Sequence, residues 1–208
     1  MPVIATVSLQ DWTTFMEWGA VIFSLAYVFL AARENIWCWL FGALSAAISV
    51  ALFIAVKLYA ESGLYVFYVI ISLYGWWQWK YSKAGPELPI VEWNLLRHVG
   101  LIAVSLIGAG GIYFLFSNYT DAEQPLLDAL TTSFSFMTTF LVAKKVLSNW
   151  IYWVVIDLIS VYLYWTRGLD VYAVLMLLYT GMAVYGYLVW RKKYLVEQNT
   201  EREFAVHE

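Results

Sequence analysis

The chain has 208 residues, of which 62% are hydrophobic and only 13% are charged, and its formal net charge is −3 at pH 7. This composition excludes an ordinary soluble domain and predicts an integral membrane protein. The net charge does not indicate nucleic-acid binding, because the basic residues are scattered along the loops rather than gathered in a patch.

Apolar stretches follow one another along the chain, each close to the roughly 20 residues that a helix needs to cross a bilayer. Seven can be placed, at residues 17–33, 36–56, 62–80, 95–117, 126–143, 149–166 and 169–190. Little sequence is left over, so we expect a single all-α transmembrane domain over 1–208 with a short polar extension after Arg191. The N-terminus lacks the basic flank of a signal peptide and is expected to be uncleaved.

The positive charges predict how the helices are oriented in the membrane. With seven crossings, ten of the twelve lysines and arginines lie on the side of the C-terminus, and only Lys57 and Arg167 lie on the other side. Loops rich in lysine and arginine tend to stay in the cytoplasm. We therefore expect an external N-terminus and a cytoplasmic C-terminus.

Two parts of the chain resemble each other at a constant difference in residue number, which is 111. Residues 29–33, Phe-Leu-Ala-Ala-Arg, match residues 140–144, Phe-Leu-Val-Ala-Lys. The same offset relates three aromatic and glycine pairs: Tyr68 and Tyr179, Gly75 and Gly186, Trp79 and Trp190. Asn35 and Trp39 are matched with Asn149 and Trp153 by assuming a three-residue insertion. The alternative is that aromatic-rich membrane helices resemble one another by composition alone.

These matches favour two three-helix repeats, at 17–80 and 126–191, joined by a connector helix at 95–117. One connecting helix leaves both units in the same orientation, which makes them parallel repeats in a 3+1+3 arrangement. In transporters built on this plan the substrate binds near the membrane midplane, between the repeats.

The stretch at 62–80 ends with three indoles around one amide, Trp76, Trp77, Gln78 and Trp79. An aromatic belt at the membrane interface is the simpler interpretation for Trp76 and Trp79. Gln78 differs, because an amide near the bilayer needs polar partners and can offer a ligand both a donor and an acceptor.

Pro125 is predicted in the first turn of the helix at 126–143, where its missing N–H does no harm. This helix is rich in hydroxyl groups, and Thr131, Ser135 and Thr138 share one face. They are candidates for lining a pathway, although such hydroxyls often bond the backbone of their own helix. Asp128 is interpreted as a charge at the helix N-terminus.

The stretch at 149–166 is apolar but carries a carboxylate at Asp157. Helical spacing places Asn149, Trp153, Asp157, Ser160 and Tyr164 on one face. An ionisable residue inside a membrane usually faces a bundle interior or a water-filled cavity and is functional. The alternatives are a bond to a hydroxyl of another helix or a structural ion pair. The stripe predicts a site for a small, flat, polar molecule.

The sequence lacks the residues that several other classes of membrane protein need. The single cysteine, Cys38, excludes an internal disulfide and a cysteine metal cluster. The last stretch holds no central lysine for retinal, and no Ser/His pair, identifiable aspartate pair or His-Glu-x-x-His helix indicates intramembrane hydrolysis. We expect no catalytic residue, no metal and no cofactor.

Three motifs together resemble the PnuC family of bacterial nicotinamide riboside transporters: Tyr-Gly-Trp-Trp-Gln-Trp at 74–79, Thr-Thr-Ser-Phe-Ser-Phe at 131–136 and Asn-Trp-x-x-Trp-x-x-x-Asp at 149–157. The resemblance implies seven helices arranged like those of the SWEET sugar transporters, but as full-length repeats, and a homotrimer. It also implies facilitated uptake across the inner membrane without ion or ATP coupling, made one-way by a cytoplasmic riboside kinase.

Nicotinamide riboside combines a flat pyridinium cation, a carboxamide and a ribose, which suit aromatic faces, amides and a carboxylate. The candidate contacts are Trp76, Trp77, Gln78, Thr131, Ser135, Asn149, Trp150, Trp153, Asp157 and Tyr164. A phosphate would call for lysine or arginine in the core, where none is found, so the riboside is favoured over the mononucleotide. Thiamine and riboflavin are the alternative substrates, and a membrane enzyme is a much less favoured alternative.

Overall fold

The computed structural model describes residues 9–55, 57, 59–81, 88–120 and 123–206, and within these ranges the chain is built from helices. The seven helices are α1 (Leu9–Ala32), α2 (Cys38–Ala55), α3 (Tyr59–Lys80), α4 (Leu95–Tyr119), α5 (Pro125–Ala143), α6 (Asn149–Thr166) and α7 (Asp170–Val206). Pro125 opens α5, as predicted, because the first turn of a helix needs no N–H there.

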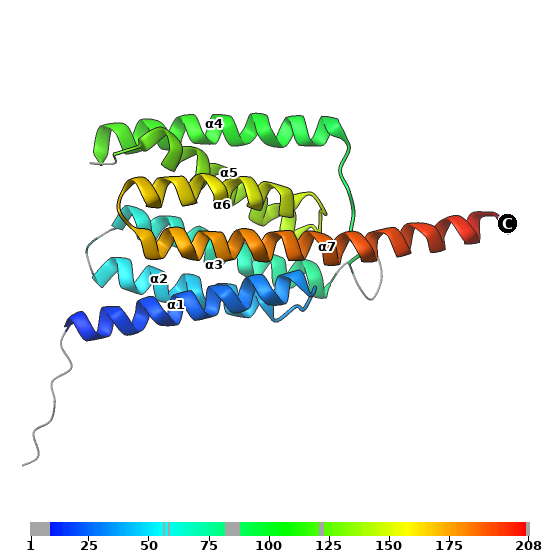
Figure 1. Ribbon diagram of the computed structural model, residues 1–208, viewed down its shortest axis with the longest axis horizontal. Coiled ribbons are helices and arrows are strands. Elements are labelled where there is room, and N and C mark those ends of the chain that lie inside the picture. Colours follow the sequence, from blue (N-terminus) through cyan, green and yellow to red (C-terminus); the bar gives the residue numbers. More distant parts are fainter. Residues whose placement is uncertain (1–8, 56, 58, 82–87, 121–122, 207–208) are drawn as a thin grey trace, which may run out of the picture.

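Six of these helices form a closed ring, in which α1 packs on α2, α2 on α3, α3 on α5, α5 on α6, α6 on α7 and α7 on α1. The remaining helix, α4, lies outside the ring against α5 (Figure 1). We call α1–α3 the first half and α5–α7 the second half. The chain therefore encloses a central space between two sets of three helices.

Five helical segments are long and apolar enough to cross a membrane: Trp12–Ala32, Cys38–Ala55, Leu95–Tyr119, Pro125–Ala143 and Asp170–Thr200. The described parts of α3 and α6 do not reach the same hydropathy. Both are rich in tryptophan, tyrosine and small polar residues, and α6 also carries Asp157. The two ring helices that fall outside this set thus belong to different halves, one in each.

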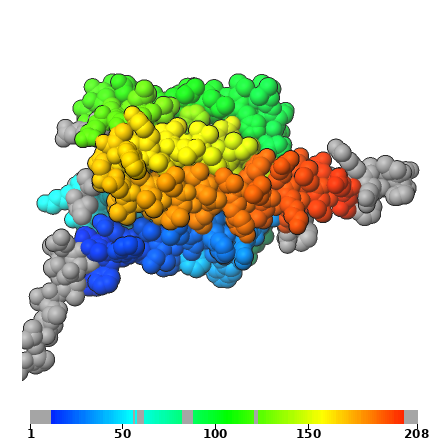
Figure 2. All heavy atoms as spheres, in the orientation of Figure 1, coloured from blue at the N-terminus to red at the C-terminus, as the bar shows by residue number. Residues whose placement is uncertain are grey.

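The outermost helices extend beyond the predicted apolar stretches. Helix α1 begins at Leu9 rather than at residue 17, and α7 continues to Val206 rather than ending near 190. The segment after Trp190 contains no proline or glycine and many good helix formers, so the α7 helix continues as it leaves the bundle. The end of α7 projects well past the other helices (Figures 1 and 2).

Four buried tryptophans close one end of the ring. Trp39 meets Trp79 edge-on with ring centroids 5.5 Å apart, and Trp150 meets Trp190 edge-on at 5.4 Å. Trp79 and Trp190 lie 6.3 Å apart and link the two pairs. We call these residues the four-tryptophan cluster.

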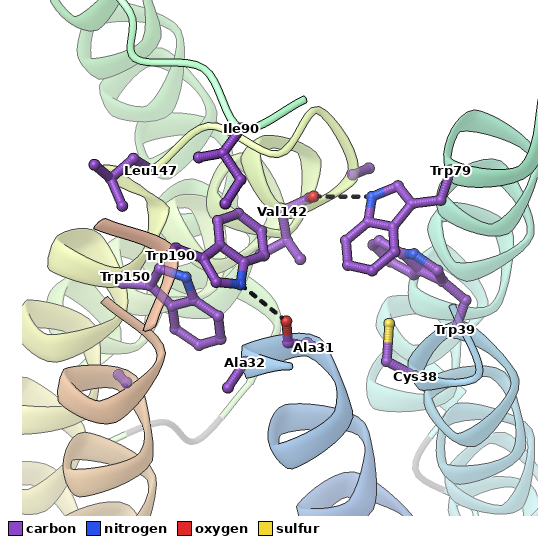
Figure 3. Close-up of a cluster of buried hydrophobic side chains, with 12 residues drawn as sticks. Ala31, Ala32, Cys38, Trp39, Trp79, Ile90, Val142, Leu147, Trp150 and Trp190 are labelled. Atoms are coloured by element: carbon purple, nitrogen blue, oxygen red, sulfur yellow. Dashed lines mark hydrogen bonds between the residues drawn. The ribbon is translucent and has the colours of Figure 1, made fainter. Parts of the chain in front are cut away.

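Hydrogen bonds at this end join the two halves reciprocally (Figure 3). The Nε1 of Trp79 donates to the carbonyl of Val142 at 3.3 Å, and the Nε1 of Trp190 donates to the carbonyl of Ala31 at 3.1 Å. The two donors are related by the offset of 111, and so are the two acceptors. Each half therefore binds the other through the same contact.

An ion pair lies beside the cluster, between equivalent loops of the two halves. The Nζ of Lys145 lies 2.7 Å from Oε2 of Glu34, and the Nζ of Lys193 lies 3.1 Å from the same oxygen. Lys145 and Glu34 are themselves related by the offset of 111, and both have a positive φ, 50° and 54°. The two loops thus turn in the same way and pair with each other.

These contacts correct one match made from the sequence. Trp39 and Trp150 occupy equivalent places, against Gly75 and Gly186, so the match of Trp39 with Trp153 is wrong. The equal turns of the two loops explain why the offset of 111 holds without an insertion.

Candidate functional site

A cavity of about 320 Å³ lies inside the ring and is bounded by all six of its helices. It ends against the four-tryptophan cluster, since Ala31, Val142, Trp150 and Ala183 belong both to the cavity wall and to the buried core around the cluster. Among the described residues that line it there is no lysine or arginine, and Asp157 is the only carboxylate.

The two halves supply matching positions to the cavity wall. Nine pairs of lining residues are separated by 111 positions: Ser24 and Ser135, Val28 and Thr139, Ala31 and Val142, Gly42 and Trp153, Ser45 and Ile156, Ala46 and Asp157, Tyr65 and Met176, Tyr68 and Tyr179, and Ser72 and Ala183. Equivalent faces of the two halves thus face one another across the cavity.

Serine and tyrosine hydroxyls connect the halves at the cavity wall. Ser24 of α1 is hydrogen-bonded to the hydroxyl of Tyr179 in α7. Ser135 of α5 and Tyr68 of α3 line the same wall. The two serines are related by the offset of 111, and so are the two tyrosines, so the wall carries the same pair of hydroxyl residues twice.

The two halves nevertheless differ in the chemistry of two wall positions. Asp157 and Trp153 of α6 stand where the first half has Ala46 and Gly42. The Asp157 side chain is buried, and it has no hydrogen bond or ion pair within the described part of the chain. A buried carboxylate of this kind is suited to binding a cation or a hydroxyl donor that enters the cavity.

Trp150 offers a second unused polar group. Its side chain lines the cavity and is 2% exposed, and its Nε1 has no hydrogen-bond partner among the described residues. An indole N–H is a donor only, so it suits a carbonyl or hydroxyl oxygen of a ligand. The second half therefore brings one carboxylate and two indole side chains to the wall of one cavity.

Four of the ten candidates from the sequence line this cavity: Ser135, Trp150, Trp153 and Asp157. Ser160, a member of the α6 stripe, lines it as well, and its hydroxyl donates to the carbonyl of Ile156. The structure thus brings together the middle of the α6 stripe and one hydroxyl of α5.

The other candidates lie outside the cavity wall. Trp77 is 55% exposed, and Trp76 packs edge-on against Trp37. The Oε1 of Gln78 accepts hydrogen bonds from Tyr74 and Lys144. All three belong to the last two turns of α3, at the end of the bundle.

Asn149, Thr131 and Tyr164 also have other surroundings. The Nδ2 of Asn149 donates to the carbonyl of Val146, and the hydroxyl of Thr131 donates to backbone carbonyls of its own helix. Tyr164 packs on Tyr172, one ring 5.6 Å from the other.

The first-half wall was missed from the sequence, although a signal for it existed. Subtracting 111 from Ser135, Trp153 and Asp157 gives Ser24, Gly42 and Ala46, and all three line the cavity. Small residues such as glycine and alanine give no chemical signal of their own, so only the repeat could reveal them.

At the opposite end of the second half, Asp128 lies in the first turn of α5 and also forms an ion pair. Its carboxylate lies 2.6 Å from Nη2 of Arg167, which joins the start of α5 to the α6–α7 turn. This hydrogen bond raises the pKa of Arg167 above its ordinary value. No group of three or more metal-ligating side chains occurs among the described residues.

A family model described as "Nicotinamide mononucleotide transporter" matches residues 14–192, which is most of the chain. The chain belongs to this transporter family. The match includes most or all of five ring helices, the part of α7 up to residue 192 and every residue of the cavity wall. The resemblance seen in the sequence motifs is thereby confirmed.

Curated relatives are distant in sequence, but the similarity covers most of their length. The nicotinamide riboside transporter PnuC of Escherichia coli is 23% identical over 203 residues, with 85% of each chain covered. The PnuC of Neisseria mucosa is 24% identical, covering 83% of this chain and 70% of that protein. The riboflavin/roseoflavin transporter RibM of Streptomyces davaonensis is also 24% identical, with 81% of each chain covered.

A solved structure, described as the crystal structure of the vitamin B3 transporter PnuC, has the same fold. It superposes with a TM-score of 0.70 at 20% identity, covering 91% of this chain and 86% of that one. The family fold is therefore present here as a multi-pass helical membrane protein.

Proposed function

We propose that this protein carries nicotinamide riboside across the bacterial inner membrane through the cavity between its halves. The observation that supports this most directly is the cavity wall, with one buried carboxylate, no lysine or arginine among the described lining residues, and aromatic faces. Two of the curated relatives are nicotinamide riboside transporters.

The substrate suits this wall group by group. The pyridinium ring is a flat cation, which the Trp153 indole can stack against and the Asp157 carboxylate can attract. The Nε1 of Trp150 is a free donor for the carboxamide oxygen or a ribose oxygen. The serine and tyrosine hydroxyls of the wall suit the ribose.

The wall also argues against a phosphorylated substrate. A phosphate group needs arginine, lysine or several backbone N–H donors in a low-dielectric site. Here it would meet Asp157 instead. The riboside is therefore favoured over the mononucleotide, although the family model carries the name of the latter.

Riboflavin is the second candidate, because a riboflavin/roseoflavin transporter is as similar to this chain as one of the riboside transporters. Riboflavin is uncharged and is larger than nicotinamide riboside, so it would gain less binding free energy from Asp157. Thiamine is a flat cation and keeps its place as a related alternative.

For the mechanism, the two halves are parallel three-helix repeats, 17–80 and 126–191, joined by α4 in a 3+1+3 arrangement. The matching wall positions and the reciprocal tryptophan bonds support this proposal. The four-tryptophan cluster closes one end in this conformation, and rearrangement of the halves exposes the cavity there. The excess of lysine and arginine on the side of the C-terminus supports a cytoplasmic location for that end.

The proposal for the energetics rests on the family resemblance, which implies uptake without ion or ATP coupling. We therefore propose facilitated diffusion, made one-way by a cytoplasmic kinase that phosphorylates the riboside. The homotrimer implied by the family resemblance belongs to the same proposal.

A binding titration by calorimetry on the purified protein tests the substrate. The ligands are nicotinamide riboside, its mononucleotide, nicotinamide, thiamine and riboflavin. We expect the riboside to bind most tightly and the mononucleotide at least tenfold more weakly. Tight binding of thiamine or riboflavin without binding of the riboside would refute the proposal.

A further inference from the structure

Tyr27 of α1 brings an unused polar group to the first-half wall. Its side chain lines the cavity, and its hydroxyl oxygen is buried without a hydrogen-bond partner among the described residues. A buried hydroxyl that makes no hydrogen bond costs free energy, because it has lost its bonds to water without replacing them. Groups kept at such a cost are often those that bond to something the protein binds.

The surroundings of Tyr27 hold its ring in one place. Trp39 packs edge-on against it, with centroids 5.8 Å apart. Gly42 leaves room for it, because a Cβ at that position would lie 3.0 Å from Cδ2 of Tyr27 and 3.2 Å from the Ser72 hydroxyl. The position of the hydroxyl is thus fixed by its neighbours in α2.

Comparison of the halves shows that large and small residues are exchanged between helices. In the first half the large residue is Tyr27 on α1, and Gly42 on α2 is small. At the equivalent positions of the second half, Thr138 on α5 is small and Trp153 on α6 is large. Each half therefore presents one aromatic residue at this pair of positions, from a different helix.

We propose that Tyr27 is a specificity-determining residue, whose hydroxyl hydrogen-bonds a ribose hydroxyl of the substrate, while Trp153 and Asp157 bind the pyridinium ring. This assignment rests on the proposed function. It follows from the division of the wall: the acid and its neighbouring indole, Trp153, lie in the second half, whereas the first half offers the unpaired hydroxyl of Tyr27 and no charged side chain among its described lining residues.

The test uses calorimetry on the full-length protein with nicotinamide riboside and its 2′-, 3′- and 5′-deoxy analogues. We expect Tyr27→Phe to lower the affinity for the riboside about tenfold, the value of one hydrogen bond. One deoxy analogue should bind the wild type as weakly as the riboside binds Y27F, and should lose nothing further in Y27F. Gly42→Ala, which displaces the ring, should lower the affinity in the same direction.

Stability separates this role from a structural one. Because the hydroxyl makes no bond to the described residues, Y27F should melt at the same temperature as the wild type, or higher, without ligand. Tyr113→Phe, the same change at an exposed position of α4, is the matched control and should leave affinity unchanged.

Equal riboside affinity in Y27F and wild type would overturn the assignment while leaving the function intact. A wild type that does not bind the riboside would overturn both.

Discussion

A carboxylate within an apolar helix is costly unless a charge or several donors compensate it. Asp157 is buried, lines the cavity, and has no such partner within the described part of the chain. Its equivalent in the first half is Ala46, so the acid breaks the symmetry of the wall at one point. In our proposal the cationic substrate supplies the missing compensation.

Removing that charge should therefore weaken binding specifically. We expect Asp157→Asn to lower the affinity for nicotinamide riboside at least tenfold, since a hydrogen bond to a charged group is worth about 1.5–3 kcal/mol. Calorimetry on the purified variant measures this. Asp170→Asn, the same change at an exposed position in the first turn of α7, is the control and should bind like the wild type. Equal affinity in D157N would show that the acid is structural.

Among the helices, α3 and α7 come unusually close to α2 and α6 at one glycine each. A Cβ at Gly75 would lie 2.4 Å from the Trp39 indole, and a Cβ at Gly186 would lie 2.7 Å from the Trp150 indole. No side chain can occupy those positions without moving a rigid indole. The two glycines thus allow the four-tryptophan cluster to form.

Substitution of either glycine should destabilise the protein. We expect Gly186→Ala and Gly75→Ala each to cost about 1–3 kcal/mol by overpacking, seen as a lower melting temperature by tryptophan fluorescence. Gly181→Ala, also in α7 but with nothing within 4 Å, is the matched control and should be neutral or slightly stabilising. Equal melting temperatures for G186A and G181A would contradict the packing.

Most helix ends were predictable from apolar length and local signals. The predicted 149–166 agrees with α6, and 126–143 with α5 within one residue, because Pro125 and the basic pair at 144 and 145 mark the boundaries. The predicted start of α1 and the predicted end of α7 were wrong, because apolar length marks where a membrane span stops but not where a helix stops.

The site was predictable only in part. With 3.6 residues in each turn, the stripe from Asn149 to Tyr164 stays within about 80° around the helix, so all its members share one face and differ mainly in their position along the axis. Only its middle, Trp153, Asp157 and Ser160, lines the cavity. The two ends of the stripe contact the loop before α6 and the tyrosines near its C-terminus instead. Sequence spacing could not show where along the helix the cavity begins and ends.

In the whole molecule, a buried ion pair joins the two halves at the end closed by the four-tryptophan cluster. Lys145 is 4% exposed and depends on Glu34 for its counter-charge. We expect Glu34→Gln to cost about 3 kcal/mol of stability, because it leaves a buried ammonium unpaired. The double variant E34Q with Lys145→Met should recover most of the loss. Thermal unfolding measures both, and a double variant no more stable than E34Q would contradict this account of the ion pair.

Transport itself gives the most direct test of the proposed function. Purified protein in liposomes, without any ion gradient, should let labelled nicotinamide riboside enter until its concentrations inside and outside are equal. The mononucleotide should not enter. The proposal would be contradicted by riboside uptake no faster than in protein-free liposomes, or by accumulation above the outside concentration that requires a proton or sodium gradient.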